Sequence, residues 1–170
     1  MISRLLADLI FAMRPRREAD FLIGPSAEDP YMRRWWIIPR NNYFNIYLHH
    51  MRHDDDDRAP HDHPWWSLSL CLRGVIREHQ MEIRRTRTWP TREAGRDWYI
   101  NWIGKGDWKW RSNQYIHRLE LPFGDAWTLF ITGPKVRKWG FWCPKGFKPW
   151  DEFVDPDNPG QPGRGCGGLD

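Results

Sequence analysis

The chain has 170 residues, enough for one domain with a substantial core and too few for two full domains. Its 26 Lys and Arg residues against 22 Asp and Glu residues give a formal net charge of +4, which permits an anionic partner without requiring one. Thirteen Trp residues are well above ordinary usage and predict a wide β core or an aromatic-lined pocket.

The first 17 residues predict a helix. Apolar residues recur there at helical spacing, but Asp8 interrupts the apolar run and no small-residue cleavage site follows, so a signal peptide is not indicated. No segment approaches the roughly 20 apolar residues that a membrane span needs. Arg4, Arg14, Arg16 and Arg17 would suit a helix bound to a membrane surface, but a helix packed against the body is the favoured interpretation.

The middle of the chain predicts β-strands punctuated by glycines. The predicted strands span residues 33–39, 43–50, 65–72, 75–83, 97–103, 115–121 and 127–132. Many short strands at near-regular spacing, with no helical pattern between them, predict an all-β sandwich or barrel. The four Asp residues at 54–57 predict a solvated loop rather than a cation site, and Arg84, Arg85 and Arg87 predict a solvated hairpin edge.

The C-terminal part predicts less regular structure. Residues 139–153 are too rich in Pro, Gly and aromatic residues for a central strand, and we expect an ordered loop that wraps one face or end of the barrel. Residues 154–170 predict a flexible Pro/Gly-rich tail. The expected organisation is therefore an N-terminal helical extension (1–30), a β-barrel (31–153) and this tail.

The cysteines are Cys71, Cys143 and Cys166. They show no CxxC spacing and leave an odd one out, so neither a disulfide framework nor a zinc ribbon is indicated. A reducing cytoplasm, and an inert, packed Cys143, are the expectations.

His61 and His63 are the first candidates for function. Side chains alternate across a strand, so residues at i and i+2 project from the same face and can bind one metal ion together. A third imidazole such as His117 would complete a set that leaves positions for water or substrate. The competing interpretation is that the pair caps a turn before Pro64.

The spacings resemble the two signature motifs of the cupin superfamily. The first motif reads Gly, five residues, His-x-His, three or four residues, Glu, six residues, Gly; the second reads Gly, five residues, Pro-x-Gly, two residues, His, three residues, Asn. The matching positions are His61, His63, Gly74, Gly106 and His117. The departing positions are Asp55, Ser67, Ser112, Gln114 and Leu121, and Ser67 stands where the usual glutamate ligand belongs.

Over residues 31–153 the chain also resembles small cupin-like proteins of bacteria and their phages, which share strings such as HDHPW, HRLEL and TGP. The resemblance implies a cupin-type double-stranded β-helix, a jelly-roll barrel, with a short N-terminal helix. It implies a divalent metal ion held by His61, His63 and His117, with iron favoured and zinc, nickel or manganese as alternatives. Cupins often dimerise through barrel edges, so a homodimer is one expectation.

Three histidines without a glutamate are similar to the ligand set of thiol dioxygenases. Three neutral imidazoles leave the ion its full +2 charge, which favours an anionic substrate. The favoured function is therefore an iron-dependent oxygenase, with a dioxygenase as the candidate enzyme, acting on a small anionic molecule. A non-catalytic protein that binds or sequesters a metal or small ligand, and a sugar isomerase or epimerase, stay as alternatives. Nucleic-acid binding is disfavoured because no known motif is present and the charges are mixed.

Further candidates surround this site. Glu78 and His79 project from opposite faces of the strand 75–83, so only one of them can point inward; Glu78 is the catalytic candidate, as a fourth ligand or general base. If Pro64 does not shift the register, Ser67 and Ser69 share the face of His63. The predicted substrate pocket is lined by Ser67, Ser69, Tyr115 and Trp127.

Overall fold

The structure is a computed structural model that describes residues 1–24, 26–55, 59–83, 96–157, 163 and 165–167. Antiparallel strands dominate it, which confirms the predicted all-β class with a short N-terminal helix. The elements are α1 (Ile2–Ala12), β1 (Phe21–Ile23), β2 (Met32–Trp36), β3 (Asn45–Met51), β4 (Ser67–Arg73), β5 (Val75–Ile83), β6 (Arg96–Gly104), β7 (Trp108–Arg111), β8 (Ile116–Glu120), β9 (Ala126–Thr132), β10 (Gly140–Cys143), β11 (Gly146–Pro149) and α2 (Trp150–Phe153).

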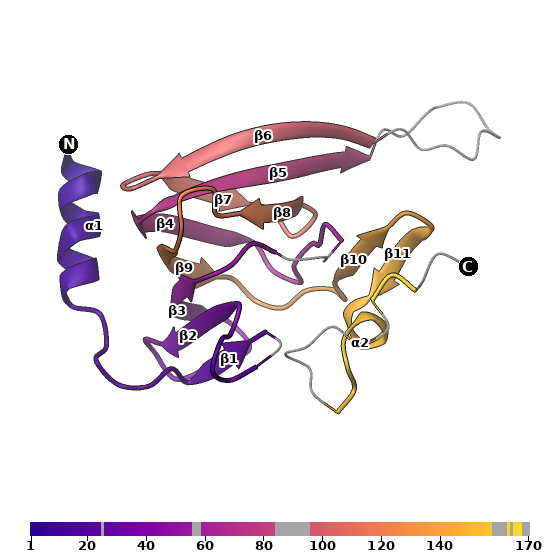
Figure 1. The fold of residues 1–170 in the computed structure, drawn as a ribbon, viewed down its shortest axis with the longest axis horizontal. Coiled ribbons are helices and arrows are strands. Elements are labelled where there is room, and N and C mark those ends of the chain that lie inside the picture. Colours follow the sequence, from indigo (N-terminus) through magenta and orange to yellow (C-terminus); the bar gives the residue numbers. More distant parts are fainter. Residues whose placement is uncertain (25, 56–58, 84–95, 158–162, 164, 168–170) are drawn as a thin grey trace.

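Two sheets enclose the interior of the protein. A six-stranded sheet has the order β1-β2-β3-β9-β4-β7, and a three-stranded sheet has the order β6-β5-β8 (Figure 1). Side chains from both sheets line one cavity of about 510 Å³ between them. The crossovers between non-consecutive strands and the cavity between the two sheets confirm the cupin-type jelly-roll architecture that the motifs predict.

Strand alternation divides the six-stranded sheet into two faces. Tyr47 and His49 of β3 face the cavity, whereas Leu48 faces the other way and packs with Trp35 and Leu70. Helix α1 covers this outer face and buries Ala7 against it, so the interpretation of α1 as a helix packed on the body is confirmed. Among the described residues, no helix has both the length and the apolar character needed to cross a bilayer.

The two motif glycines that match the sequence pattern occupy turns that other residues would strain. Gly74, between β4 and β5, has φ of 84°, and a Cβ there would lie 2.4 Å from the backbone oxygen of Asp125. Gly106 has φ of 90°, and a Cβ there would lie 2.6 Å from Cγ of Arg4. Positive φ values and close backbone approaches both favour glycine, so these motif positions are structural.

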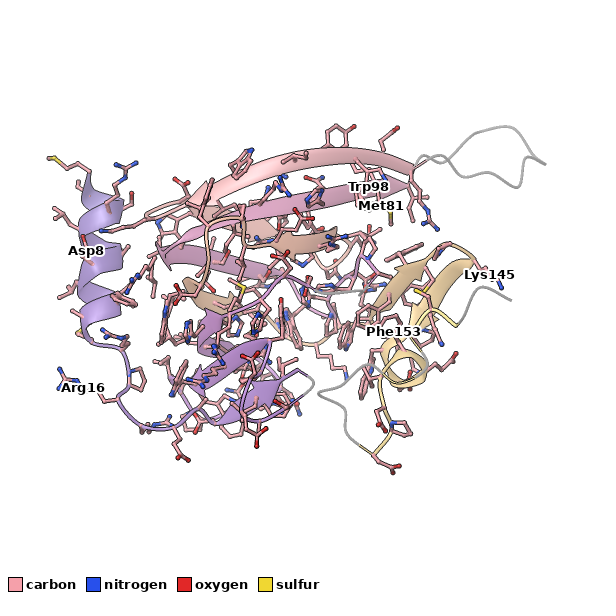
Figure 2. All side chains as sticks on the ribbon, viewed as in Figure 1. Asp8, Arg16, Met81, Trp98, Lys145 and Phe153 are labelled. Atoms are coloured by element: carbon pink, nitrogen blue, oxygen red, sulfur yellow. A yellow bond between two sulfur atoms is a disulfide. The ribbon has the colours of Figure 1, made fainter. Side chains whose placement is uncertain are left out.

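The expectation of a loop at 139–153 is wrong. Strands β10 and β11 form an antiparallel hairpin there, and α2 follows it (Figure 1). Phe153 of α2 stacks on Phe141 of β10 with ring centroids 3.7 Å apart, beneath the hairpin in Figure 2. The aromatic residues that argued against a strand therefore form a small core of their own, together with Cys143 and Val154.

The expectation that the cysteines form no disulfide is also wrong. Cys143 of β10 and Cys166 form a disulfide, and Cys71 is free and buried. The backbone N–H groups of Gly163 and Gly165 donate to the carbonyl of Phe153, which holds this part of the C-terminal segment beside α2. Arg84, Arg85 and Arg87 lie outside the described residues.

Thiol titration should detect one disulfide and one buried free cysteine per chain. Burial raises the pKa of the Cys71 thiol to about 11, so at pH 8 little reactive thiolate is present in the native state. We expect slow alkylation of native protein, one reactive thiol per chain in denaturant, and three after reduction. Mass mapping of the alkylated peptides identifies the thiols. Three reactive thiols in denaturant without reductant would contradict the disulfide.

Candidate metal centre

Backbone pairing brings His61 and His117 together although they are far apart in the sequence. The N–H of each residue donates to the carbonyl of the other at 2.9 Å, so the two form an antiparallel bridge. His61 makes a second bridge with Phe141 of β10. The short segment around His61 therefore lies between β8 and β10, and the position of His63, two residues later, follows from strand alternation.

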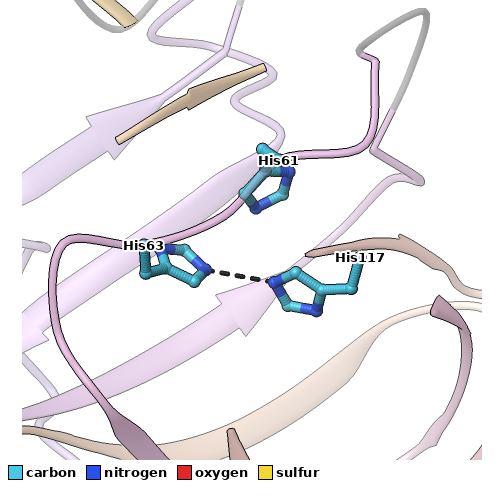
Figure 3. Close-up of side chains that lie close together, drawn as sticks. All are labelled: His61, His63 and His117. Carbon is cyan, nitrogen blue, oxygen red and sulfur yellow. Dashed lines mark hydrogen bonds between the residues drawn. The ribbon is translucent and has the colours of Figure 1, made fainter. Parts of the chain in front are cut away.

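The three imidazoles converge on one point. One ligand nitrogen from each of His61, His63 and His117 can be chosen so that all lie within 4.8 Å of one another. Nε2 of His63 lies 3.1 Å from Nε2 of His117, and Figure 3 shows the three rings around a shared space. His117 is buried, and His61 and His63 are half-buried. The structure thus brings together all three histidines predicted as ligands.

Glu78 points inward and His79 outward, which settles the question left by the sequence. The Glu78 side chain is fully buried, and its Oε1 lies 2.8 Å from Nδ1 of His117. This is the ring nitrogen remote from His63, so Glu78 is not placed as a fourth ligand. A carboxylate on Nδ1 keeps the proton there and leaves the Nε2 lone pair of His117 directed at the cluster.

Other polar groups compensate the charge of Glu78. Nε of Arg111 donates to Oε1 at 2.6 Å, the Tyr115 hydroxyl donates to Oε2 at 2.9 Å, and Nζ of Lys109 lies 3.5 Å from Oε2. Burial alone would raise the pKa of the Glu78 carboxyl, but the His117 hydrogen bond and the charge of Arg111 outweigh it and hold that pKa well below its usual range. Glu78 is therefore an ionised carboxylate placed to orient His117, and its catalytic role stays a prediction.

Asp55 is a site residue that the sequence interpretation missed. The run of Asp residues at 54–57 was expected to be solvated, yet Asp55 is 3% exposed and its Oδ2 lies 3.7 Å from Nδ1 of His61. The same oxygen accepts the N–H of Leu119 on β8 at 3.1 Å. Asp55 occupies the position of the first motif glycine, so the departure from the motif places a carboxylate beside a candidate ligand. Asp56 and Asp57 lie outside the described residues.

Replacement of Asp55 by Asn should weaken metal binding without abolishing it. The amide keeps the size of the side chain but loses the charge beside His61, and loss of a group that orients a ligand typically lowers affinity about 10- to 100-fold. Competition with a chromophoric chelator measures the zinc affinity. The control is Asp125→Asn, because Asp125 pairs with His50 at 2.7 Å away from the cluster. Equal zinc affinity of the two variants would remove Asp55 from the site.

His63 is placed to be a neutral ligand. Burial lowers the pKa of His63 well below its usual value, and the charges of Arg111 and Arg34 lower it further. The ring lies between aromatic neighbours, 6.1 Å from Trp139 and 6.3 Å from Phe130. An imidazole that stays neutral at physiological pH offers a lone pair to a metal ion.

Asp62 faces away from the cluster, as alternation predicts, and ties it to β10. Its Oδ1 accepts the N–H of Gly140 at 3.0 Å, and its Oδ2 pairs with Nη1 of Arg137 at 2.9 Å. Together with the His61–Phe141 bridge, these bonds hold the β10–β11 hairpin over the histidines.

The predicted substrate-pocket residues divide into two groups. Ser69 lines the cavity, where its hydroxyl accepts from Arg111 at 2.8 Å, and Ser67 is buried on the same face of β4. Tyr115 contacts Glu78 beside the cavity. The prediction that Trp127 lines the pocket is wrong. Its position on β9 directs the side chain to the outer face of the sheet, where its ring stacks on that of Trp35 with centroids 5.4 Å apart.

Comparison with known proteins gives structural similarity alone. No protein-family model and no curated protein matches the chain. The DMSP lyase DddQ from Ruegeria pomeroyi DSS-3 is 14% identical, with 73% of this chain and 58% of that chain covered and a TM-score of 0.48. A recombinant oxalate oxidase in complex with glycolate is 9% identical (75% and 62% covered, TM-score 0.48), and Bacillus subtilis oxalate decarboxylase is 13% identical (70% and 27% covered, TM-score 0.45). The chain spans less than two thirds of the length of each.

Proposed function

We propose that the protein holds one divalent metal ion through His61, His63 and His117 and that, with iron, it is an oxygenase of a small anionic substrate. One observation carries the proposal: three imidazole nitrogens from two distant segments lie within 4.8 Å of one another in the lining of a cavity of about 510 Å³. Three neutral nitrogen ligands on one side of an ion leave its other positions accessible from the cavity.

The hydrogen bonds around the cluster support a bound cation. Glu78 holds the proton of His117 on Nδ1, so the Nε2 lone pair of His117 is directed toward Nε2 of His63 at 3.1 Å. Two neutral imidazoles at this distance can form one N–H···N hydrogen bond with each other. The ring of His61 faces the same space, and that single hydrogen bond does not include it. A metal ion satisfies all three lone pairs at once, and the donor set fits zinc, iron or nickel.

The surrounding residues suit an anionic ligand. The ion keeps its full charge because all three ligands are neutral, and Arg34 and Arg111 add positive charge near His63. Tyr115 stays a neutral hydrogen-bond donor because burial and Glu78 raise its pKa. Phe141 and Trp139 pack against one side of the histidines, with ring centroids 5.8 Å from His61 and 6.1 Å from His63 respectively. Bound iron would supply redox chemistry toward dioxygen, and a dioxygenase reaction that places both oxygen atoms in the substrate needs no further reductant.

The test begins with metal content and then measures oxygen uptake. We expect one divalent ion per chain after reconstitution, and oxygen consumption by the iron form with small organic acids that carry a thiol, amine or hydroxyl group. The product should gain both atoms of ¹⁸O₂ by mass spectrometry, and the zinc form should be inactive. Calorimetric binding of an acid without oxygen uptake would favour a ligand-sequestering protein instead. Failure to bind any divalent ion would overturn the proposal.

A further inference from the structure

Arg34 is a cation of the cavity for which the described part of the chain supplies no carboxylate partner. It lines the cavity from β2, directly opposite His49 of β3 in the sheet register, and its Nε donates to Nε2 of His49 at 2.9 Å. Among the described residues, no acidic side chain forms an ion pair with Arg34. The other arginines near the cluster differ, because Arg111 pairs with Glu78 and Arg137 pairs with Asp62.

Holding the Arg34 guanidinium in the cavity without an anion costs free energy in the ligand-free protein. Arg34 is half-buried, and this partial loss of hydration lowers the pKa of its guanidinium to about 10. Cations withdrawn from water in proteins are commonly paired with an anion, because a hydrogen bond to a neutral acceptor replaces only part of the lost hydration. An unpaired cation that lines a cavity is therefore suited to an anion that comes from outside.

The neighbours of Arg34 hold its guanidinium in one orientation. Burial, and then the charge of Arg34, lower the pKa of His49 well below its usual value, so His49 is neutral and accepts through Nε2. The His49 ring stacks between Tyr47 at 5.9 Å and Phe130 at 4.9 Å. The Arg34 guanidinium carbon lies 4.9 Å from the centroid of the Tyr47 ring. A fixed planar fork is what bidentate carboxylate recognition requires.

The Arg34–His49 pair and the histidine cluster belong to the same cavity. Phe130 lies between them, with its ring 4.9 Å from His49 and 6.3 Å from His63. Arg34 and the three histidines line one space of about 510 Å³, which is large enough for a small organic acid.

We propose that Arg34, oriented by His49, is the carboxylate-binding residue of this cavity, and that the ligand is a small organic acid whose second donor atom reaches the ion at His61, His63 and His117. The second half of this statement rests on the proposed metal centre, and the first half does not. Arg34 selects ligands that carry a carboxylate, and the metal ion selects those with a second group that can coordinate it.

The test compares lactate with its neutral amide, lactamide, as calorimetric probes of the zinc-loaded and metal-free proteins. We expect the wild-type protein to prefer lactate in both forms. Arg34→Met should lower the lactate affinity by about tenfold or more and leave the lactamide affinity unchanged. Zinc content should stay at the wild-type level. The matched control is Arg33→Met, because Arg33 neighbours Arg34 on β2 and alternation places it on the opposite face.

The outcomes separate the two proposals. Equal lactate affinity of Arg34→Met and wild type, or no preference of the wild type for lactate over lactamide, overturns the carboxylate subsite and leaves the metal centre intact. If the wild-type protein binds no zinc, the metal centre is overturned. The lactate affinities of the metal-free wild type and Arg34→Met proteins then still test the role of Arg34. If Arg34→Met does not fold, Arg34→Lys keeps the charge without the fork and should show a reduced preference for lactate.

Discussion

His117→Ala is expected to abolish stoichiometric metal binding while the fold persists. The substitution removes one of three ligand nitrogens but keeps the backbone bridge to His61, because that bridge uses main-chain N–H and carbonyl groups. Glu78 keeps its bonds from Arg111 and Tyr115, so no buried charge is left alone. The loss of zinc affinity should exceed the about 10- to 100-fold loss that follows removal of a group hydrogen-bonded to a ligand.

Elemental analysis after dialysis against a weak chelator, with circular dichroism as a check on folding, measures this effect. The matched control is His79→Ala, since His79 lies on the same sheet but faces outward and pairs with Glu120 at 2.9 Å. We expect the control to keep one ion per chain. A folded His117→Ala protein with full metal content would show that the three-histidine cluster does not hold the ion.

Glu78→Gln is expected to lower both stability and metal affinity. The amide keeps the shape of the side chain, but Arg111, which is 4% exposed, loses its anionic partner. Breaking a buried ion pair on one side typically costs about 3–5 kcal/mol in the free energy of unfolding. The His117 tautomer is also no longer held by a charge, so zinc affinity should fall about 10- to 100-fold.

A second variant separates these two effects. Glu78→Gln combined with Arg111→Gln removes both charges, so chemical denaturation should show most of the stability restored while zinc affinity stays low. Glu120→Gln is the control for a carboxylate on the outer face of the same sheet, where it pairs with Arg77 and Arg118. If Glu78→Gln changed neither stability nor zinc affinity relative to Glu120→Gln, the positioning role of Glu78 would be wrong.

The sequence anticipated the features that depend on local alternation. The predicted strand 75–83 coincides with β5, and the inward face of Ser69 follows from its parity with His63. Alternation also separates Glu78 from His79, although it could not tell which of them points inward. That choice depends on which face of β5 meets the interior, and hence on pairing with β6 and β8.

Errors arose where the partner of a segment lies far along the chain. The hairpin β10–β11 joins the sheet through His61, so no pattern within 139–153 reveals its strand pairing. The Cys143–Cys166 disulfide depends on the packing of α2 against β10. Asp55 is buried because its carboxylate accepts from Leu119 on β8, which a run of like charges conceals. Trp127 turned outward because the parity of β9 follows from its two neighbours in the sheet.

The sequence by itself therefore determined the strand-rich class, the short helix and the three histidines, since two-residue periodicity and motif spacing are local properties. Only the tertiary structure decided how those histidines are held and what accompanies them. Glu78 on His117, Asp55 beside His61 and Arg34 opposite His49 all come from strand register and sheet packing. Register is set by the contacts of the whole chain, because a shift of one residue would exchange every inward side chain for an outward one.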